Sequence, residues 1–323
     1  MFKGKKVMLW IIGILLTIII GTVAGGYFYF NHLVNKTTKV EINKENIGIT
    51  EEVEEKLSKY SDTIINIALF GVDADENGVG RSDSIIIATI DTVHKKLKLT
   101  SVMRDSYVDI EGYGYDKINH AYAFGGPELA INTLNRNFDL NIKDFVSVNF
   151  STLPKIIDKL GGVDIDVDAE ELNYINGYIN SINNINGTSS PNISSVGVQH
   201  MDGTKAMAYC RIRYTSGGDY KRTERHREVL SEIFSKVISL NVTTYPSLLN
   251  EILPMVETSL KSSDILDLGN EVLKMGKSTL EQERFPRDGY CQGEMINGVY
   301  YLTFDKATTV EQIHNYIFED KLD

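Results

Sequence analysis

Five arginines lie in one short window of an otherwise acidic chain. The window from Tyr209 to Arg227 reads YCRIRYTSGGDYKRTERHR, and its arginines are Arg211, Arg213, Arg222, Arg225 and Arg227. Guanidinium groups make bidentate, charge-assisted hydrogen bonds to phosphate oxygens, so the cluster predicts a phosphate or pyrophosphate site. The alternative is a solvated basic helix start paired with Glu224 and Glu228, because charge runs usually lie on the surface.

The local pattern around the window predicts how these arginines converge. Arg211 and Arg213 alternate, so an extended segment would point both to one side, and the turn at 216–218 would reverse the chain toward them. Asp219 is then placed to cap a helix that begins near Tyr220 and presents its N-terminus to an anion. The apolar residues that recur at helical spacing are Val229, Leu230, Ile233, Phe234, Val237 and Ile238.

Two aspartates lie at the ends of two predicted apolar strands: one follows the first strand and the other precedes the second. Asp73 ends the predicted strand Ile64 to Val72, and Arg81-Ser82-Asp83 precedes the predicted strand Ser84 to Ile90. Asp73 and Asp83 on neighbouring strand ends supply the oxygen ligands that a hard divalent cation prefers, with Arg81 near a phosphate bound to that cation. The alternative is that these aspartates are ordinary turn formers.

Arg104 and Asp105 directly follow a third apolar strand, Leu97 to Met103. An arginine at the end of a buried strand needs a partner, which is either Asp105 or the phosphate of a ligand. His120 follows a turn rich in glycine and tyrosine, and we interpret it as a structural polar residue rather than a catalyst.

The N-terminal segment predicts a membrane anchor. Val7 to Phe30 contains no charged side chain, is long enough to cross a bilayer, and follows Lys3, Lys5 and Lys6. The positive-inside rule places residues 1–6 in the cytoplasm and the chain after Asn31 outside the cell. The small residues 24–26 leave signal-peptide cleavage as an alternative, but the apolar run exceeds a typical signal-peptide core.

The remaining chain predicts one α/β domain. Residues 31–62 are polar and include a short acidic helix, EEVEEKLSKY, which we interpret as an extracellular stalk; residues 63–323 form the domain. Its alternation of strands and helices predicts an α-β-α sandwich with a central mixed sheet. The stretch from Asn173 to Ser195 is rich in Asn, Ser and Gly and is predicted to be a mobile excursion.

Composition excludes some classes of function. The formal net charge of -11 argues against nucleic acid as a partner, since a polyanion would find only a local basic patch. Two cysteines, Cys210 and Cys291, exclude a metal site built from cysteine, and their pairing stays open. There is no G-x-S-x-G motif and the six histidines are scattered, which argues against a Ser-His hydrolase.

Six motifs in order resemble those of the LytR-CpsA-Psr family, a group of membrane-anchored enzymes of Gram-positive cell envelopes. They are GVD at 71–73, RSDS at 81–84, SVMRDSYV at 101–108, KINHAYAFGG at 117–126, LGGVDIDV at 160–167, and the arginine window. No single motif is specific, but their order behind an N-terminal anchor is. The resemblance covers about Ile64 to Leu240.

The resemblance implies a phosphotransferase that moves a glycopolymer, such as teichoic acid or a capsular-type polysaccharide, from an undecaprenyl-pyrophosphate carrier to peptidoglycan. It implies that Asp73 and Asp83 hold Mg²⁺, with Mn²⁺ as an alternative. The implied pyrophosphate ligands are Arg81, Arg104, Arg211, Arg213, Arg222 and Arg225. The family commonly has glutamine after the last of these arginines, whereas this chain has His226 and Arg227. The lipid tail is expected in an apolar tunnel within the domain.

The residues agree with this chemistry. Phosphoryl transfer accumulates charge on a pyrophosphate leaving group, and arginines with a metal ion stabilise that charge. The nucleophile would be a sugar hydroxyl, and Asp83 or Asp105 would assist its deprotonation. Two other functions stay open: a polyprenyl-pyrophosphate phosphatase that uses water as nucleophile, and a non-catalytic envelope module that binds polyprenyl lipid or glycan.

Overall fold

The computed structural model describes residues 32–74, 80–240, 244–275 and 279–322. The predicted cytoplasmic tail and transmembrane anchor, residues 1–30, lie outside these residues. Within the described part of the chain, no helix combines the length and apolar character needed to span a membrane.

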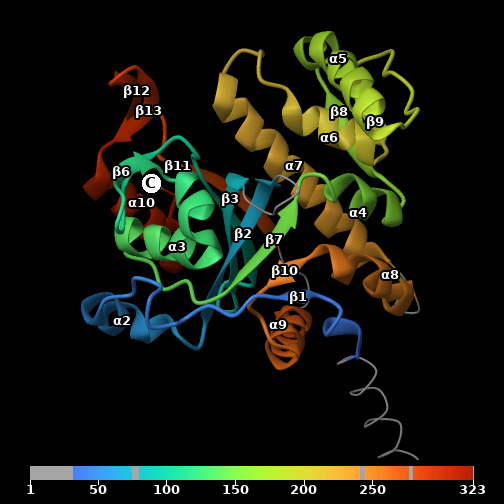
Figure 1. Ribbon diagram of the computed structural model, residues 1–323. Coiled ribbons are helices and arrows are strands. Elements are labelled where there is room, and N and C mark those ends of the chain that lie inside the picture. The colour runs from blue at the N-terminus through green and yellow to red at the C-terminus, as the bar shows by residue number, and fades with distance from the viewer. Residues whose placement is uncertain (1–31, 75–79, 241–243, 276–278, 323) are drawn as a thin grey trace, which may run out of the picture.

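A seven-stranded mixed sheet forms the centre of the domain (Figure 1), in the order β1-β10-β7-β2-β3-β4-β11. The pairs β2–β3, β3–β4 and β10–β7 are antiparallel, and the pairs β1–β10, β2–β7 and β4–β11 are parallel. In sheet order, the strands are Thr38–Lys39, Glu257–Thr258, Phe145–Asn149, Ile64–Ala74, Gly80–Asp91, Lys96–Val102 and Thr279–Phe285. The central mixed sheet of the prediction is therefore confirmed.

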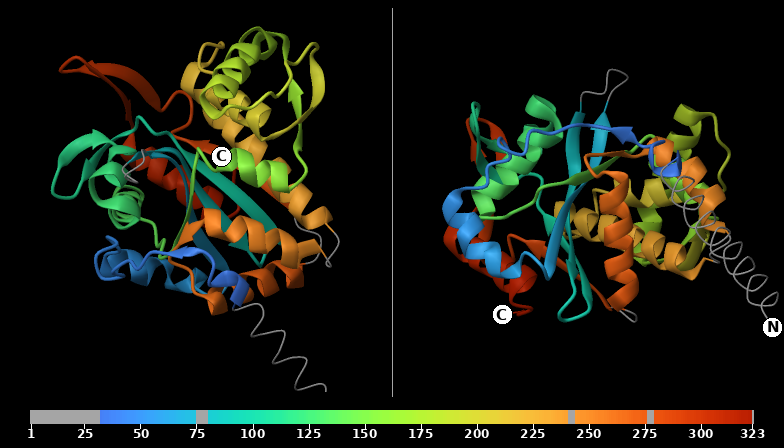
Figure 2. Two further views of the ribbon diagram at one scale, coloured as in Figure 1. Left: turned by 45° about the vertical axis from the view of Figure 1, so that its right-hand side comes forward. Right: turned by 90° about the horizontal axis from the view of Figure 1, so that it is seen from below.

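Helices cover both faces of this sheet (Figures 1 and 2). Successive residues of a strand point to opposite faces, so Ile64 and Ala68 of β2 join the main core while Ile65 packs against a smaller cluster behind the sheet. Helices α2 (Glu51–Leu57), α3 (His120–Phe138) and α10 (Lys306–Phe318) contribute to the main core. Helices α7 (Gly218–Ser239) and α9 (Ser262–Met275) cover the other face. These three layers form the predicted α-β-α sandwich.

A helical lobe extends from this sandwich around a second apolar cluster. Its elements are α4 (Leu153–Lys159), β8 (Val163–Val167), α5 (Ala169–Asn186), β9 (Gly197–Met201) and α6 (Gly203–Arg211). Strands β8 and β9 pair only with each other among the described residues, so β8 is not part of the central sheet. The remaining helices are η1 (Ser58–Tyr60), α8 (Tyr245–Ile252) and η3 (Leu253–Met255).

The predicted mobile excursion at Asn173 to Ser195 is wrong for most of its length, because residues up to Asn186 belong to helix α5. Asp168 and Glu171 form a capping box at its start, with reciprocal bonds of 2.7 and 3.1 Å between each backbone N–H and the other's carboxylate. Ile175, Ile179 and Ile182 recur at helical spacing and are buried in the lobe. Cap and apolar stripe outweigh the low helix propensity of the asparagines and serines.

The predicted stalk contributes to the domain. Strand β1 pairs with β10 at the edge of the sheet, and Val53 and Leu57 of α2 are buried in the main core. Thr50 begins α2 by accepting a hydrogen bond of 3.2 Å from the Val53 N–H. The described part of residues 31–62 is thus packed on the sandwich rather than extended as a free spacer.

Two hairpins stand across from the helical lobe at the ends of β2 and β3 (Figure 1). One hairpin consists of β5 (Tyr107–Ile110) and β6 (Gly114–Lys117), and the other of β12 (Cys291–Ile296) and β13 (Val299–Phe304). They are joined where the Leu302 N–H donates to the Asp105 carbonyl at 2.9 Å. The strand ends that carry Asp73 and Asp83 therefore lie between two flanking structures.

Candidate functional site

The arginine window folds differently from its prediction but still gathers arginines. Arg211 is the last residue of α6 and not part of an extended segment. Gly217, at φ 88°, occupies the N-cap of α7, so Asp219 lies in the first turn and does not cap the helix. An αL conformation favours glycine at this position, which explains the Gly-Gly pair. The end of α6 and the start of α7 nevertheless bring Arg211, Arg213 and Arg222 to one cavity.

This polar cavity has a volume of about 370 Å³ and combines basic and acidic side chains. It is lined by Asp73, Asp83, Phe150, Tyr178, Ser181, Met207, Cys210, Arg211, Arg213, Tyr214, Arg222 and His226. Its size falls within the ordinary range for small-molecule sites, about 300–1,000 Å³. The cavity brings together three of the predicted phosphate ligands and both predicted metal ligands.

A β-bulge places Asp83 in this cavity. In the β2–β3 register, Gly71 lies opposite Ser84 and Val72 opposite Ser82, so Asp83 is the extra residue. In a regular strand, Asp83 and Ser84 would point to opposite faces of the sheet. The bulge re-aims the backbone so that Asp83 lines the polar cavity while Ser84 lines the adjoining apolar one. No residue type in RSDS reveals this bulge in the sequence.

Arg104 connects the carboxylates around the site. Its Nη1 lies 2.8 Å from Asp83 Oδ2, and its Nε lies 3.4 Å from Asp219 Oδ1 and 3.6 Å from Asp105 Oδ2. Burial alone would raise the pKa of Asp83, but the charges of Arg104 and Arg222 and hydrogen bonds from Arg104 and Asn119 lower it below its ordinary value. Asp83 is therefore held ionised, as a metal ligand must be.

Asp219 is a site residue that the sequence pattern assigned only to helix capping. It forms an ion pair with Arg222, and both side chains are largely buried. Burial raises the pKa of Asp219 despite the neighbouring Arg222 and Arg104 charges. Asp219 Oδ2 and Arg222 Nε have no hydrogen-bond partner among the described residues. Buried polar atoms without a protein partner are typical of sites that receive a ligand or an ion.

Four predicted site residues do not line this cavity: Arg104, described above, and Arg225, Arg81 and Asp105. Arg225 is 2% exposed and its guanidinium binds Glu171 Oε1, the Ile212 carbonyl and Thr215 Oγ1 at 2.7, 3.2 and 2.7 Å. Arg81 is exposed, with Nη1 at 3.5 Å from His120 Nε2. Asp105 Oδ1 accepts a hydrogen bond of 2.7 Å from Lys117 Nζ.

A second, apolar cavity adjoins the polar one. It has a volume of about 130 Å³, lies between the sheet and α7, and is lined mainly by aliphatic side chains such as Leu69, Ile86 and Val229. Phe150, Cys210 and His226 line both cavities, so the two meet at these side chains. Cys210 and Cys291, whose pairing the sequence left open, are free thiols.

His226 keeps the junction of the two cavities uncharged. Burial and the charge of Arg222 lower the pKa of His226 to about 3, although its ring contacts the Cys210 carbonyl at 3.2 Å. The imidazole is then neutral in the folded chain above about pH 3, whereas in the unfolded chain it binds a proton below about pH 6.5. The unfolded state binds more protons in this window, so folding stability falls as the pH falls.

We expect His226→Gln to remove this pH dependence. At pH 5 the wild-type chain should lose about 2 kcal/mol of stability through His226 relative to pH 7.5, because each pH unit below 6.5 costs about 1.4 kcal/mol. Urea unfolding at both pH values measures the loss in each protein. Equal losses in the wild type and His226→Gln would contradict a neutral buried imidazole. His200→Gln is the matched control, because His200 is exposed.

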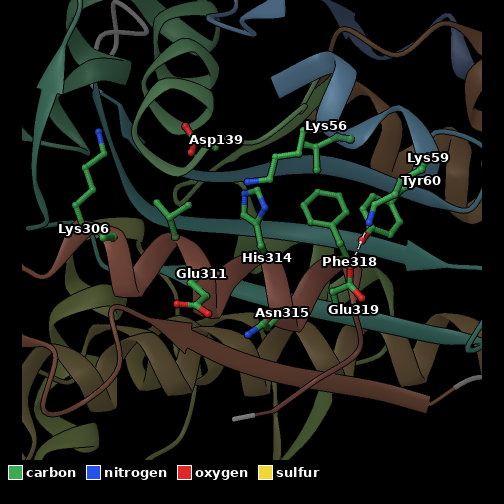
Figure 3. Close-up of a pocket in the computed structure, with 13 residues that line it drawn as sticks. Lys56, Lys59, Tyr60, Asp139, Lys306, Glu311, His314, Asn315, Phe318 and Glu319 are labelled. Carbon is green, nitrogen blue, oxygen red and sulfur yellow. Dashed lines mark hydrogen bonds and ion pairs between the residues drawn. The ribbon is translucent and has the colours of Figure 1, made fainter. Parts of the chain in front are cut away.

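A larger cavity, about 730 Å³, lies elsewhere, between α2 and α10 (Figure 3). None of the predicted site residues lines it. Its polar groups bind one another: Glu319 pairs with Lys59 and Tyr60, and His314 Nε2 lies 3.1 Å from the Phe138 carbonyl. The ring of Phe318 lies 5.2 Å from that of Tyr60. These contacts fasten η1 and the end of α3 to α10 and its C-terminal end.

Fold and site together define an α/β domain that joins an arginine-lined cavity to an apolar one, and comparison with known proteins gives its family. The model of the LytR_cpsA_psr family matches residues 27–317, so the chain belongs to this family. The family resemblance drawn from the six motifs is therefore confirmed.

Individual relatives are similar over nearly the whole chain. The polyisoprenyl-teichoic acid–peptidoglycan teichoic acid transferase TagU of Enterococcus faecalis is 32% identical over 90% of this chain and 92% of its own. The TagU of Bacillus cereus is 31% identical over 94% of both chains. A solved structure described as TagT bound to LIIa-WTA is 26% identical over 80% of this chain and 91% of its own, with a TM-score of 0.64. Another, YwtF (TagT) with bound octaprenyl pyrophosphate lipid, is 25% identical over 79% and 90%, with a TM-score of 0.59.

Proposed function

We propose that this protein is a phosphotransferase that moves a glycopolymer, a teichoic acid or a capsular-type polysaccharide, from an undecaprenyl-pyrophosphate carrier to peptidoglycan. The observation that carries the proposal is the junction of the arginine-lined cavity with the apolar cavity at Phe150, Cys210 and His226. A polyprenyl pyrophosphate has a polyanionic head next to an apolar tail, which matches this pair. The names of the TagU relatives and the lipid bound by a related structure support the same substrate class.

The arginines supply binding and electrostatic stabilisation. Arg211, Arg213 and Arg222 line the polar cavity, where their guanidinium groups neutralise the pyrophosphate and the charge that grows on it as the bond to the transferred phosphoryl group breaks. Arg104 positions Asp83 through their 2.8 Å ion pair. Arg81, on the exposed strand end, would meet phosphate oxygens outside the cavity, and Arg225 would act through the loop that it holds.

The donor set at this site fits Mg²⁺. Asp73 and Asp83 line one cavity, and Mg²⁺ is commonly bound by one or two carboxylates together with substrate phosphates. When bound there, the cation would neutralise phosphate charge; Mn²⁺ is the alternative. The residues that would accept the proton of the attacking sugar hydroxyl are Asp83 and Asp105, and both lie within 4 Å of Arg104.

The membrane is part of this proposal. A single span at residues 7–30, with the N-terminus in the cytoplasm, would hold the domain outside the cell beside its lipid-linked donor. The apolar cavity of 130 Å³ lies below the usual range for ligand sites, so a long prenyl tail requires its walls to separate. Helix α7 contributes Val229, Leu230 and Ile233 to these walls, and we expect it to be the element that moves.

Transfer in vitro tests the proposal. The full-length chain in detergent micelles is incubated with a polyprenyl-pyrophosphate-linked saccharide and peptidoglycan oligomers, and products are followed by mass. We expect a saccharide-phosphate joined to the glycan, formed with Mg²⁺ or Mn²⁺ and suppressed by excess EDTA. Asp83→Ala should abolish it, whereas Asp62→Ala, an exposed change outside the site, should not. Full activity in excess EDTA would show that transfer does not require a metal ion.

The two alternatives give different products in the same assay. Release of phosphate without an acceptor would favour a polyprenyl-pyrophosphate phosphatase. Tight binding of the lipid with no product, and binding that survives Asp83→Ala, would favour a non-catalytic envelope module.

A further inference from the structure

Exposed aromatic side chains gather on the two hairpins beside the site. Among the residues that the structure describes, seven aromatic side chains are largely exposed, and four of them lie on or against β5–β6 and β12–β13. These four are Tyr113, Tyr115, Phe124 and Tyr300, with exposures of 57, 65, 40 and 47%. Solvent-exposed aromatic rings that cluster in this way usually mark a binding surface.

We name four of the hairpin tyrosines the tyrosine wall: Tyr107, Tyr115 and Tyr301, whose rings are in contact through Tyr107, and Tyr300, which shares Lys117 with Tyr301. The ring of Tyr107 lies 5.2 Å from that of Tyr115 and 4.8 Å from that of Tyr301, and so links the two hairpins. Tyr300 neighbours Tyr301 on β13, and Lys117 Nζ lies 5.8 Å from the centre of each ring. Stacking of Tyr113 on Phe124, at 4.5 Å, extends the surface beyond β6.

The tyrosine wall reaches the candidate site. Lys117 Nζ, which lies over Tyr300 and Tyr301, also binds Asp105 at 2.7 Å. Partial burial and the carboxylates of Asp105 and Asp219 raise the pKa of Tyr300. A molecule lying along the tyrosine wall would therefore end beside Asp105, one of the two residues proposed to accept the nucleophile's proton.

We propose that the tyrosine wall binds the sugar rings of the acceptor glycan and delivers its hydroxyl to the site; this inference rests on the proposed function. The apolar faces of sugar rings stack on tyrosine rings, while tyrosine hydroxyls hydrogen-bond sugar hydroxyls. The net negative charge of the two hairpins disfavours binding of the donor glycan, which carries phosphate. Residues 107–117 and 291–304 carry four acids, Asp109, Glu111, Asp116 and Glu294, and one cation, Lys117, and Arg136 of α3 pairs with Asp109 and Glu111, so four negative charges and two positive leave -2. A phosphate-rich donor polymer is repelled there, whereas uncharged sugar rings are not.

The donor glycan is expected to leave the arginine-lined cavity on a different side from the tyrosine wall. Tyr178 of α5 and Tyr214 line the arginine cavity itself, on the helical lobe, whereas no residue of the tyrosine wall lines that cavity. The saccharide attached to the pyrophosphate therefore continues along the lobe, and the hairpins across from it are left for the second substrate. The two flanking structures would each hold one of the glycans that the reaction joins.

Acceptor kinetics of the full-length chain test this assignment. We expect Tyr115→Ala and Tyr300→Ala each to raise the KM for peptidoglycan oligomers about tenfold, with the KM for the lipid-linked donor unchanged. Tyr115→Phe and Tyr300→Phe should keep most of the affinity, because the stacking ring remains. Tyr290→Ala is the matched control: Tyr290 is 44% exposed but lies at the base of β12, outside the tyrosine wall.

A direct binding measurement separates failure of this inference from failure of the proposed function. Saturation-transfer NMR with an uncharged oligomer of β-1,4-linked N-acetylglucosamine should show binding to the wild type that is lost in the Tyr115→Ala/Tyr300→Ala double variant. If the wild type catalyses transfer and the double variant has an unchanged KM for the acceptor, the tyrosine wall does not bind the acceptor, while the proposed transferase function stands. If the double variant instead has a raised KM for the lipid-linked donor, the tyrosine wall binds the donor, and the assignment to the acceptor is wrong. Absence of transfer by the wild type would reject the proposed function, and the NMR result alone would then decide whether the wall binds glycan.

Discussion

Replacing Arg213 with alanine is expected to lower kcat/KM for glycopolymer transfer by about 10²–10³-fold while the melting temperature stays unchanged. Arg213 lines the polar cavity, and its side chain is 55% exposed. Its one ion pair among the described residues is a long contact of 4.0 Å with Asp83. Since little of the fold depends on this side chain, its removal should affect mainly the stabilisation of phosphate charge, and the loss of one such group typically has this magnitude.

Steady-state transfer kinetics and a circular dichroism melt of the same preparations check this expectation. Lys221→Ala is the matched control, because Lys221 is a similarly exposed cation on the first turns of α7 that pairs with Glu224 and lines no part of the cavity. Full activity of Arg213→Ala would show that Arg213 does not bind the pyrophosphate. An unfolded Arg213→Ala would show that its ion pair is structural.

Arg104 is a less selective target than Arg213, although both were predicted from the sequence as phosphate ligands. Arg104 lies within 3.6 Å of three carboxylates, those of Asp83, Asp105 and Asp219. Its loss would leave these partly buried acids facing one another without a cation, so activity and stability should fall together. An activity loss in Arg104→Ala therefore cannot be assigned to the substrate contact alone.

The sheet and its polar strand ends could be predicted because their pattern is local. Apolar runs such as Ile64 to Val72 specify buried strands, and Asp73 and Arg104 follow two of them directly. Contacts between distant segments could not be predicted in the same way. The sequence gives no sign that β11 adds to β4, or that the bulge at Asp83 turns this side chain into the cavity.

The arginine window shows how residue type limits a prediction of role. All of its arginines can bind phosphate, and the structure brings Arg211, Arg213 and Arg222 to the cavity but not Arg225. The partner of Arg225 is Glu171 in the first turn of α5, just before the stretch from Asn173 whose composition predicted a mobile excursion. Because that helix was not predicted, the buried acid that faces Arg225 was not predicted either.

Replacing Arg225 with alanine is expected to destabilise the fold by about 3–5 kcal/mol. The Arg225 and Glu171 side chains are 2% and 7% exposed, and Nε lies 2.7 Å from the Glu171 carboxylate. Removing one member of a buried ion pair leaves the other charge without compensation, which has this typical cost. The same guanidinium binds the Ile212 carbonyl and Thr215, so its loss should also release the loop that carries Arg213 and lower transfer indirectly.

Urea unfolding measures this cost, and the double variant Glu171→Met/Arg225→Met separates charge from packing. Replacing a buried pair with apolar side chains of similar length is often close to neutral, so the double variant should recover much of the stability that Arg225→Ala loses, less the capping-box bond from the Asp168 N–H to Glu171. It should not recover full transfer, because methionine cannot bind the Ile212 carbonyl. An Arg225→Ala protein that is as stable as the wild type, yet has lost affinity for the lipid-linked donor, would instead make Arg225 the pyrophosphate ligand that the sequence predicted. The two outcomes are opposite in stability, so one variant decides whether this arginine holds the substrate or the loop beside it.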